Sequence, residues 1–440
     1  MRRFTKILAA LAITLLVATT AGSFPGTVSA APAELRRCAL PMGRDFQTAT
    51  PEEVGLDSAA LAPVRAIIDA PTRLNVKIFR NNCLIVTGPR NAATGGLPWN
   101  LWSATKPVVA LVAGLAVDEG LLDLDAPIDA YLPPGLGDAE HRALLVRNLL
   151  TESSGLRVAV VSEGFSGIAH LDSNIVAQAL AIPFEAPQGT VWKYSQRVVD
   201  LLAYVVQQAV GEDFQSYAQR KLFDPLGIRP TDYHWARDRS GNTYGHAHLI
   251  MAPDDFAKLG LLVANRGMWN ETRVLSAGYL ADTARPSAAM PCYGYLFVVN
   301  GPICEQEFPG LPADALKMSG MMRQDNYIAP SLDLLVSWTG ITTPGTDTAF
   351  AYRVMETVTG AFRVPRLPTL PPFIEPTDVS VTDPMMTNLD ATLAAFGLGP
   401  YAYPGCDPLA CLGKPLPPPF ADWPAGCFVI GCFNPQPGRR

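Results

Sequence analysis

Ser103 and Lys106 form the only Ser-x-x-Lys sequence in the chain. On a helix, residues three apart share one face, so the two side chains would lie one turn apart. A serine hydroxyl reacts well only when a base takes its proton, and a buried lysine can be that base because desolvation lowers its pKa. The pair therefore predicts acyl transfer through Ser103 with Lys106 as base. The alternative is a helix-capping serine followed by a surface lysine.

A second segment, Tyr194-Ser195-Gln196, directly precedes an apolar helical stretch. The Tyr194 hydroxyl can exchange a proton with a leaving group, and the Gln196 amide can position a substrate. The alternative for Tyr194 is simple packing at the start of a helix.

A third segment, Met318-Ser319-Gly320, lies ahead of a strand predicted at 326–329. Main-chain N–H groups at such a strand, together with that of Ser103, can bind a carbonyl oxygen as it becomes negative. Ser-Gly is also a common turn sequence, so this segment has a plain structural alternative.

The elements that must position these residues follow a clear order. Residues 107–117 are apolar on every face, which predicts a helix at the centre of a domain. Strands are predicted at both ends of the chain and helices between them. The predicted strands are 75–86 (a pair turning at Asn81-Asn82), 293–300, 326–329 and 332–338, and the predicted helices are 56–70, 107–117, 198–210, 214–223, 254–265 and 346–359.

This order predicts an α+β fold: an antiparallel sheet built from both chain ends, flanked by helices, with a mainly helical lobe inserted. A groove between the two parts is the expected place for a site.

In this order and spacing, the three segments resemble the penicillin-recognising serine hydrolases, which include class C β-lactamases, D-alanyl-D-alanine carboxypeptidases, esterases and 6-aminohexanoate-dimer hydrolases. The resemblance covers about 51–362 and includes the segments 99–107, 120–127, 149–156, 223–227, 251–260 and 267–276. It implies a β-lactamase/transpeptidase-like fold and no metal or organic cofactor. It also implies an acyl-enzyme on Ser103, with Lys106 as base and Tyr194 in proton transfer. Gln196, Ser319 and Gly320 are the residues predicted to contact substrate.

Two departures from the family pattern bear on the substrate. Gln196 stands where Asn is usual, and Met318 stands where Lys or His usually opens the third motif. Lys317 is one residue out of register, so the alternation of a strand would turn it away from the site. A cation there would help to hold a substrate carboxylate.

The departures favour an esterase or amidase acting on a small-molecule or peptide-like substrate. The alternatives are a β-lactamase or D-alanyl-D-alanine peptidase acting on peptidoglycan, and a non-catalytic cell-envelope binding protein.

The N-terminus has the pattern of a signal peptide. Basic residues at 1–6 are followed by an apolar run at 7–18 and by Val28-Ser29-Ala30, which predicts cleavage after residue 30. A membrane anchor is the competing reading, but the run is shorter than the roughly 20 residues that a spanning helix needs. Residues 31–363 are expected to form the hydrolase domain of a secreted, periplasmic or cell-envelope protein, with no membrane segment after cleavage.

Residues 364–440 form a Pro- and Cys-rich extension, through which the protein would associate with the cell envelope. All eight cysteines follow the predicted cleavage point. The pattern Gly-Cys, four residues, Cys occurs at 405–411 and 426–432, which predicts two small disulfide loops in an exported chain. Zinc is the alternative, although the spacing is not the usual one.

Several other functions are excluded. A net charge of −6 and the absence of a basic cluster after residue 30 argue against nucleic-acid binding. His246 and His248 would share one face of a strand, but no carboxylate ligand follows at a supporting spacing, so packing is expected. The chain has no Gly-x-Ser-x-Gly, Gly-x-Gly-x-x-Gly or Walker motif.

Overall fold

The structure is a computed structural model that describes residues 34–304, 307–342, 348–375 and 386–433. The predicted signal peptide at 1–30 lies outside these residues. The chain from Leu35 onward forms one folding unit.

A six-stranded antiparallel sheet is assembled from both ends of this unit, as the sequence predicts. Two N-terminal strands pair with four strands from the C-terminal half because β1 lies directly beside β11. In spatial order the strands are β2 (Cys83–Thr87), β1 (Arg73–Arg80), β11 (Leu334–Gly340), β10 (Gln324–Ala329), β9 (Leu316–Gly320) and β8 (Val298–Val299).

The strands alternate between two cores, as the period of two requires. Ile328 and Leu335 face the core shared with α4 (Thr105–Asp118), whereas Tyr327 and Val336 face the opposite core. The first side also carries α11 (Pro253–Ala264) and α12 (Ala277–Thr283), and the opposite side is covered by α1 (Ser58–Leu61), α2 (Val64–Ile68) and α13 (Phe350–Gly360).

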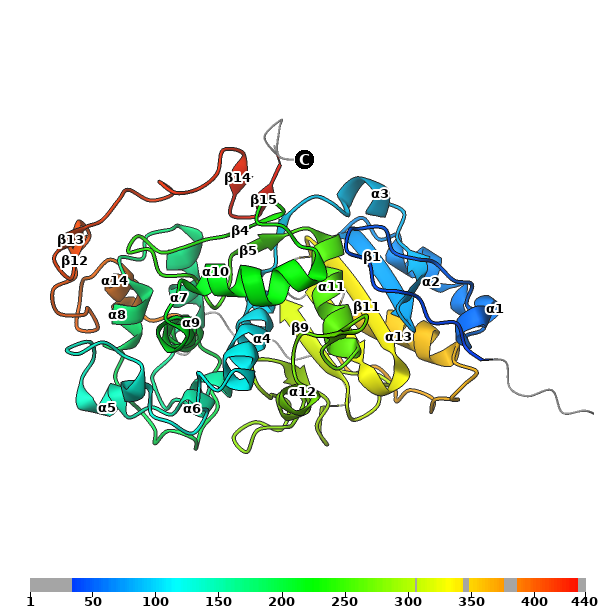
Figure 1. The fold of residues 1–440 in the computed structure, drawn as a ribbon, viewed down its shortest axis with the longest axis horizontal. Coiled ribbons are helices and arrows are strands. Elements are labelled where there is room, and N and C mark those ends of the chain that lie inside the picture. The colour runs from blue at the N-terminus through cyan, green and yellow to red at the C-terminus, as the bar shows by residue number, and fades with distance from the viewer. Residues whose placement is uncertain (1–33, 305–306, 343–347, 376–385, 434–440) are drawn as a thin grey trace, which may run out of the picture. The chain divides into compact units, whose positions relative to one another are not determined.

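The inserted lobe is mainly helical and packs against α4, so that α4 lies between the lobe and the sheet (Figure 1). Its helices are α5 (Ala139–Arg142), α6 (Val146–Leu150), α7 (Val160–Ile168), α8 (Ile175–Ala179), α9 (Arg197–Val210) and α10 (Phe214–Ala218), which continues into a π-helical turn at Gln219–Phe223. The short remaining elements are α3 (Asn91–Thr94), the hairpin β6 (Met268–Trp269) and β7 (Thr272–Arg273), and 3₁₀ turns at Glu52–Val54, Ile128–Ala130, Asp224–Leu226 and Pro330–Leu332.

Two sequence predictions about these elements need correction. The helix predicted over 56–70 is divided into α1 and α2 at Pro63, which has no N–H for the helical ladder. The strand predicted over 293–300 is reduced to β8, because Leu296 has a positive φ of 58° and the Gly294 N–H binds the Phe297 carbonyl in a turn.

The third motif lies ahead of the strand predicted at 326–329, which is β10, and Met318, Ser319 and Gly320 themselves form the end of a preceding strand, β9. The turn at 321–323 then leads into β10.

A second sheet, which the sequence does not predict, links the lobe to the C-terminal extension. Its strands are β14 (Cys427–Phe428), β15 (Gly431–Cys432), β3 (Trp99–Asn100), β5 (Leu249–Met251) and β4 (Tyr233–Trp235). The extension also contributes α14 (Leu389–Ala395), which packs on α7, and the small pair β12 (Ala410–Cys411) and β13 (Lys414–Pro415). Figure 1 shows this orange and red segment running along the lobe.

Four disulfides cross-link the described chain. The two predicted small loops are present as Cys406–Cys411 and Cys427–Cys432. The other two bonds are Cys38–Cys83 and Cys292–Cys304. In the part of the chain that the structure covers, no helix combines the length and the apolar character needed to cross a membrane.

Candidate active site

Ser103 lies in a single 3₁₀ turn, Trp102–Ala104, between β3 and α4. The Trp102 N–H binds Asn100 Oδ1 at 2.8 Å, and the Leu101 N–H binds the Leu249 carbonyl of β5 at 2.9 Å. Trp102 has a positive φ of 50°, which costs a non-glycine residue about 1–3 kcal/mol. The neighbouring strands thus hold a strained turn that presents the half-buried Ser103 at the mouth of an apolar helix.

Lys106 is the second residue of α4 and is 1% exposed. Its Nζ donates a hydrogen bond to Gln196 Oε1 and lies 4.1 Å from the centroid of the Tyr194 ring. The Gln196 amide also donates to the Val160 carbonyl at 3.4 Å. Lys106, Tyr194 and Gln196 therefore meet in space, and the amide predicted to face substrate contacts the lysine.

Gly320 brings β9 against the serine turn. A Cβ at this position would lie 2.1 Å from the Leu101 carbonyl oxygen, so only glycine permits this approach. The hydroxyl of Ser319 donates to Asp325 Oδ1 at 2.6 Å. The close contact places the end of β9 beside Ser103, as the proposed binding of a carbonyl oxygen requires.

The faces of β9 separate Met318 from Lys317. Met318 is fully buried in the core that contains α4. Lys317 pairs across the sheet with Tyr327 on the other face, and its Nζ binds Glu307 at 2.6 Å. The ammonium group is thus held by a carboxylate on the face opposite Met318, yet Lys317 still borders the cavity, which the register argument does not predict.

A cavity of about 430 Å³ joins these elements. Among the described residues that line it, Lys106, Lys317 and Arg323 are basic and none is acidic. The lining residues are Ser103, Lys106, Tyr194, Tyr293, Leu296, Val298, Lys317, Ser319, Gly320, Met321, Met322, Arg323 and Thr342. Five of the six residues chosen from the sequence border this one space, and Gln196 lies behind Lys106.

The residues that form this arrangement lie within the range that matches a known protein family. The family described as "Beta-lactamase" matches residues 79–368, which include Ser103, Tyr194 and Gly320. The chain belongs to the β-lactamase family. The fold and the family that the sequence motifs indicate are thereby confirmed.

Among curated members of similar sequence, Esterase EstB of Burkholderia gladioli is 33% identical over 147 residues, which are 30% of this chain and 37% of that protein. Penicillin-binding protein 4* of Bacillus subtilis (strain 168) is 25% identical over 213 residues, 43% of this chain and 44% of that protein. The chain therefore matches less than half the length of these relatives.

Solved structures share the β-lactamase fold at low identity. A family VIII carboxylesterase has a TM-score of 0.55 at 18% identity, covering 70% of this chain and 98% of that one. The octameric penicillin-binding protein homologue from Pyrococcus abyssi has a TM-score of 0.53 at 17% identity, covering 71% and 79%.

Glu152 is a site residue that the sequence reasoning missed in this β-lactamase-family chain. It lies in the loop after α6 and is 1% exposed. Its Oε1 accepts the Ser195 N–H at 3.1 Å. Burial raises the pKa of Glu152 to about 7, although Lys106 and the Ser195 N–H act to lower it. A buried carboxyl group therefore lies beside the predicted base.

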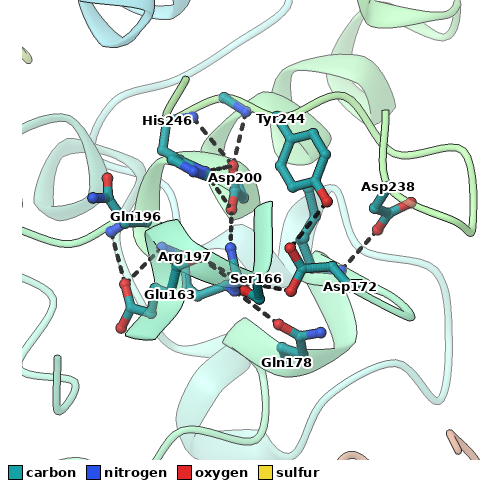
Figure 2. Close-up of polar contacts among 12 residues, drawn as sticks. Glu163, Ser166, Asp172, Gln178, Gln196, Arg197, Asp200, Asp238, Tyr244 and His246 are labelled. Carbon is teal, nitrogen blue, oxygen red and sulfur yellow. Dashed lines mark hydrogen bonds and ion pairs between the residues drawn. The ribbon is translucent and has the colours of Figure 1, made fainter. Parts of the chain in front are cut away.

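A buried polar network stands behind the start of α9, where Gln196 lies (Figure 2). Glu163 Oε2 accepts the Gln196 N–H at 2.9 Å. Arg197 binds Asp172 at 2.6 Å and Asp200 at 2.9 Å. These bonds fix the first turn of α9 and hence the amide that contacts Lys106.

His246 and His248 belong to the same interior region. His246 Nδ1 lies 2.9 Å from Asp200 Oδ1, and His248 Nδ1 lies 3.0 Å from the amide of Asn100. Burial and the neighbouring His246 hold the pKa of His248 well below its usual value. Both rings are buried, and the described residues contain no group of three or more His, Cys, Asp or Glu that could hold a metal ion.

Proposed function

We propose that this chain is an exported serine hydrolase that cleaves an ester or amide bond through an acyl-Ser103 intermediate. The observation that carries the proposal is the placement of Lys106: an almost fully buried amine that borders the same cavity as Ser103 and Tyr194. A solvated lysine in the first turn of a helix would not lie there. Esterases and penicillin-binding proteins among the relatives support hydrolysis by a serine.

The proposed reaction uses these groups in turn. Lys106 Nζ takes the proton of Ser103 Oγ while Oγ forms a bond to the acyl carbon. The carbonyl oxygen becomes negative and is stabilised by the Ser103 N–H and main-chain N–H groups at the end of β9. Tyr194 passes a proton to the leaving alcohol or amine. Water then attacks the acyl-enzyme, and the acid leaves as Oγ regains its proton.

Ser103→Ala and mass spectrometry test this proposal together. The wild type should hydrolyse short-chain p-nitrophenyl esters and gain the mass of a fluorophosphonate on Ser103. The alanine variant should do neither. Ester hydrolysis that persists in Ser103→Ala, or a label on another residue, would contradict the proposal and favour the non-catalytic binding protein.

One observation favours the second candidate, a β-lactamase or D-alanyl-D-alanine peptidase. Position 318 carries no cation, but the cavity is bordered by Arg323, which is half-buried on the turn after β9. Within the described residues, no carboxylate forms an ion pair with this guanidinium. Arg323 could hold a substrate carboxylate. Faster hydrolysis of a chromogenic cephalosporin than of neutral short-chain esters would select this candidate.

Export is supported by four disulfides, which persist in oxidising compartments. N-terminal sequencing of protein recovered from outside the producing cytoplasm should begin at Ala31. An intact Met1 on the extracellular protein would contradict cleavage after residue 30.

A further inference from the structure

Glu152 occupies a position that is unusual for its residue type. It is a charged side chain in a loop, yet it is almost fully buried, and its backbone has a positive φ of 49°. Residues other than glycine rarely adopt this left-handed conformation, and a buried carboxyl group is costly without partners. Glu152 does not line the cavity, but it lies next to Lys106 and Ser195, and two separate costs at one residue indicate that its neighbours hold it in place for a role.

The hydrogen bonds of Glu152 lie on both sides of Tyr194. Its main-chain carbonyl accepts the Lys193 N–H at 2.9 Å. Its side-chain Oε1 accepts the Ser195 N–H at 3.1 Å. The segment is further held where the Gly189 N–H binds the Ser153 carbonyl at 2.7 Å. Glu152 therefore fixes the peptide groups that flank Tyr194, which restricts where the phenol can lie.

The carboxyl group also faces the charge of Lys106. Four groups face it: Lys106 from α4 attracts its negative form, the Ser195 N–H and the Tyr293 hydroxyl stabilise that form, and Glu163 from α7 repels it. Its second oxygen, Oε2, is buried without a hydrogen bond among the described residues. An ammonium group that forms on Lys106 would meet this oxygen across a region of low dielectric constant, where attraction is strong.

We propose that Glu152 is a positioning residue of the reaction: it holds the peptide groups on both sides of Tyr194 and supplies the negative charge that stabilises the ammonium form of Lys106. This inference rests on the proposed function, because it assigns a task relative to Ser103 and Lys106. The Ser103 proton still passes to Lys106 Nζ and later to the leaving group. The carboxylate changes the energy of the charged intermediate state and takes no part in bond making.

The pH dependence of kcat/KM tests the charge of Glu152. Activity requires neutral Lys106, so the acid limb of the profile reports the apparent pKa of the Lys106–Glu152 pair. In Glu152→Gln the ammonium loses its counter-charge, and the acid limb should move to lower pH by about one unit or more. Glu152→Asp retracts the carboxylate by one methylene and should move the limb in the same direction by less.

Glu119→Gln is the matched control. Glu119 lies at the opposite end of α4, where it binds Lys221 and the hydroxyl of Tyr217. The variant removes one carboxylate from the far end of the helix that carries Lys106, and its acid limb should coincide with that of the wild type. Far-UV circular dichroism shows which variants are folded. If Glu152→Gln does not fold, Glu152→Asp provides the test.

The outcomes separate this inference from the proposed function. Folded Glu152 variants that lose rate with no movement of the acid limb would overturn the charge role, and an equal shift in Glu119→Gln would do the same. A wild type that neither hydrolyses esters nor reacts with fluorophosphonate at Ser103 would instead overturn the proposed function itself.

Discussion

Two buried polar clusters lie on either side of Gln196, and they differ in how far their charges are paired. In the first, behind the start of α9, Arg197 binds Asp172, Asp200, Ser166 and Gln178 within 2.9 Å. In the second, at the cavity, Lys106 has an amide and a ring face as partners, and the Glu152 Oε2 has no hydrogen bond among the described residues. The first cluster pairs its cation with carboxylates, whereas the second leaves the Lys106 amine hydrogen-bonded to a neutral amide beside the cavity, which suits the proposed reaction.

Among the variants that compare the two clusters, Ser103→Ala should have the largest effect. It removes the proposed nucleophile from the cavity and should lower ester hydrolysis by at least about a thousandfold. Because a half-buried hydroxyl is replaced by hydrogen, the midpoint of denaturant unfolding should stay close to that of the wild type. A matching loss of stability would show that the cavity cluster is structural.

Arg197→Met tests the opposite cluster. It leaves Asp172 and Asp200 as buried carboxylates without their cation, which should cost about 3–5 kcal/mol in the free energy of unfolding. Arg220→Met is the control, because its pair with Glu212 is exposed and should be worth about 0–1 kcal/mol. Equal denaturant midpoints for the two variants would break the distinction between the clusters.

The two clusters should also contribute to the free energy of unfolding with opposite dependence on pH. Burial opposes ionisation of Asp200, but His246 and Arg197 lower its pKa to about 2, so its stabilising contribution is lost as pH falls from about 4 towards 2. The pKa of Glu152 is raised to about 7, so its contribution is present below about pH 4.5 and is lost as pH rises through 7.

Glu152→Gln isolates the pH-dependent contribution of Glu152 to stability. Because the pKa of Asp238 is also raised to about 7 by burial, the informative quantity is the difference in unfolding free energy between variant and wild type. This difference should shift in favour of the variant by about 3 kcal/mol between pH 4.5 and 7.5. Urea unfolding at both pH values measures it, and a constant difference would contradict the prediction.

Arg323→Gln gives the smallest expected effect. If the Arg323 guanidinium holds a substrate carboxylate, kcat/KM for a p-nitrophenyl hemiester of succinic acid should fall about tenfold, the value of one charged hydrogen bond. The neutral butyrate ester should be unaffected. Arg65→Gln removes an exposed arginine of α2 and should alter neither rate. Equal losses for both esters would assign Arg323 a structural role.

The sequence predicts what depends on local spacing. Three-residue separation places Lys106 one turn from Ser103, the unbroken apolar run identifies α4, and the repeated cysteine spacing identifies both tail loops. In each case the relevant contact lies within a few residues, so periodicity or chain geometry suffices. The sheet built from both chain ends follows because its long strands alternate clearly.

Long-range contacts account for what the sequence does not reveal. Glu152 reaches Ser195 only because its loop adopts a left-handed backbone, and no local pattern marks that. The strands of the second sheet are two or three residues long, too short for alternation to show. Arg323 lies on a turn whose position becomes clear only when β9 is known to contain Gly320.

The contact between Asn100 and the disulfide loop at 427–432 changes where this protein can safely be shortened. Asn100 donates its side-chain amide to the Val429 carbonyl at 2.7 Å and its N–H to the Ile430 carbonyl at 3.0 Å, while its Oδ1 holds the strained Trp102. The family match stops at 368, yet a chain cut there would leave Asn100 without both acceptors. Truncation, proteolytic trimming or reduction of the last cysteine pair should therefore disturb the turn that holds Ser103, which lies more than three hundred residues upstream.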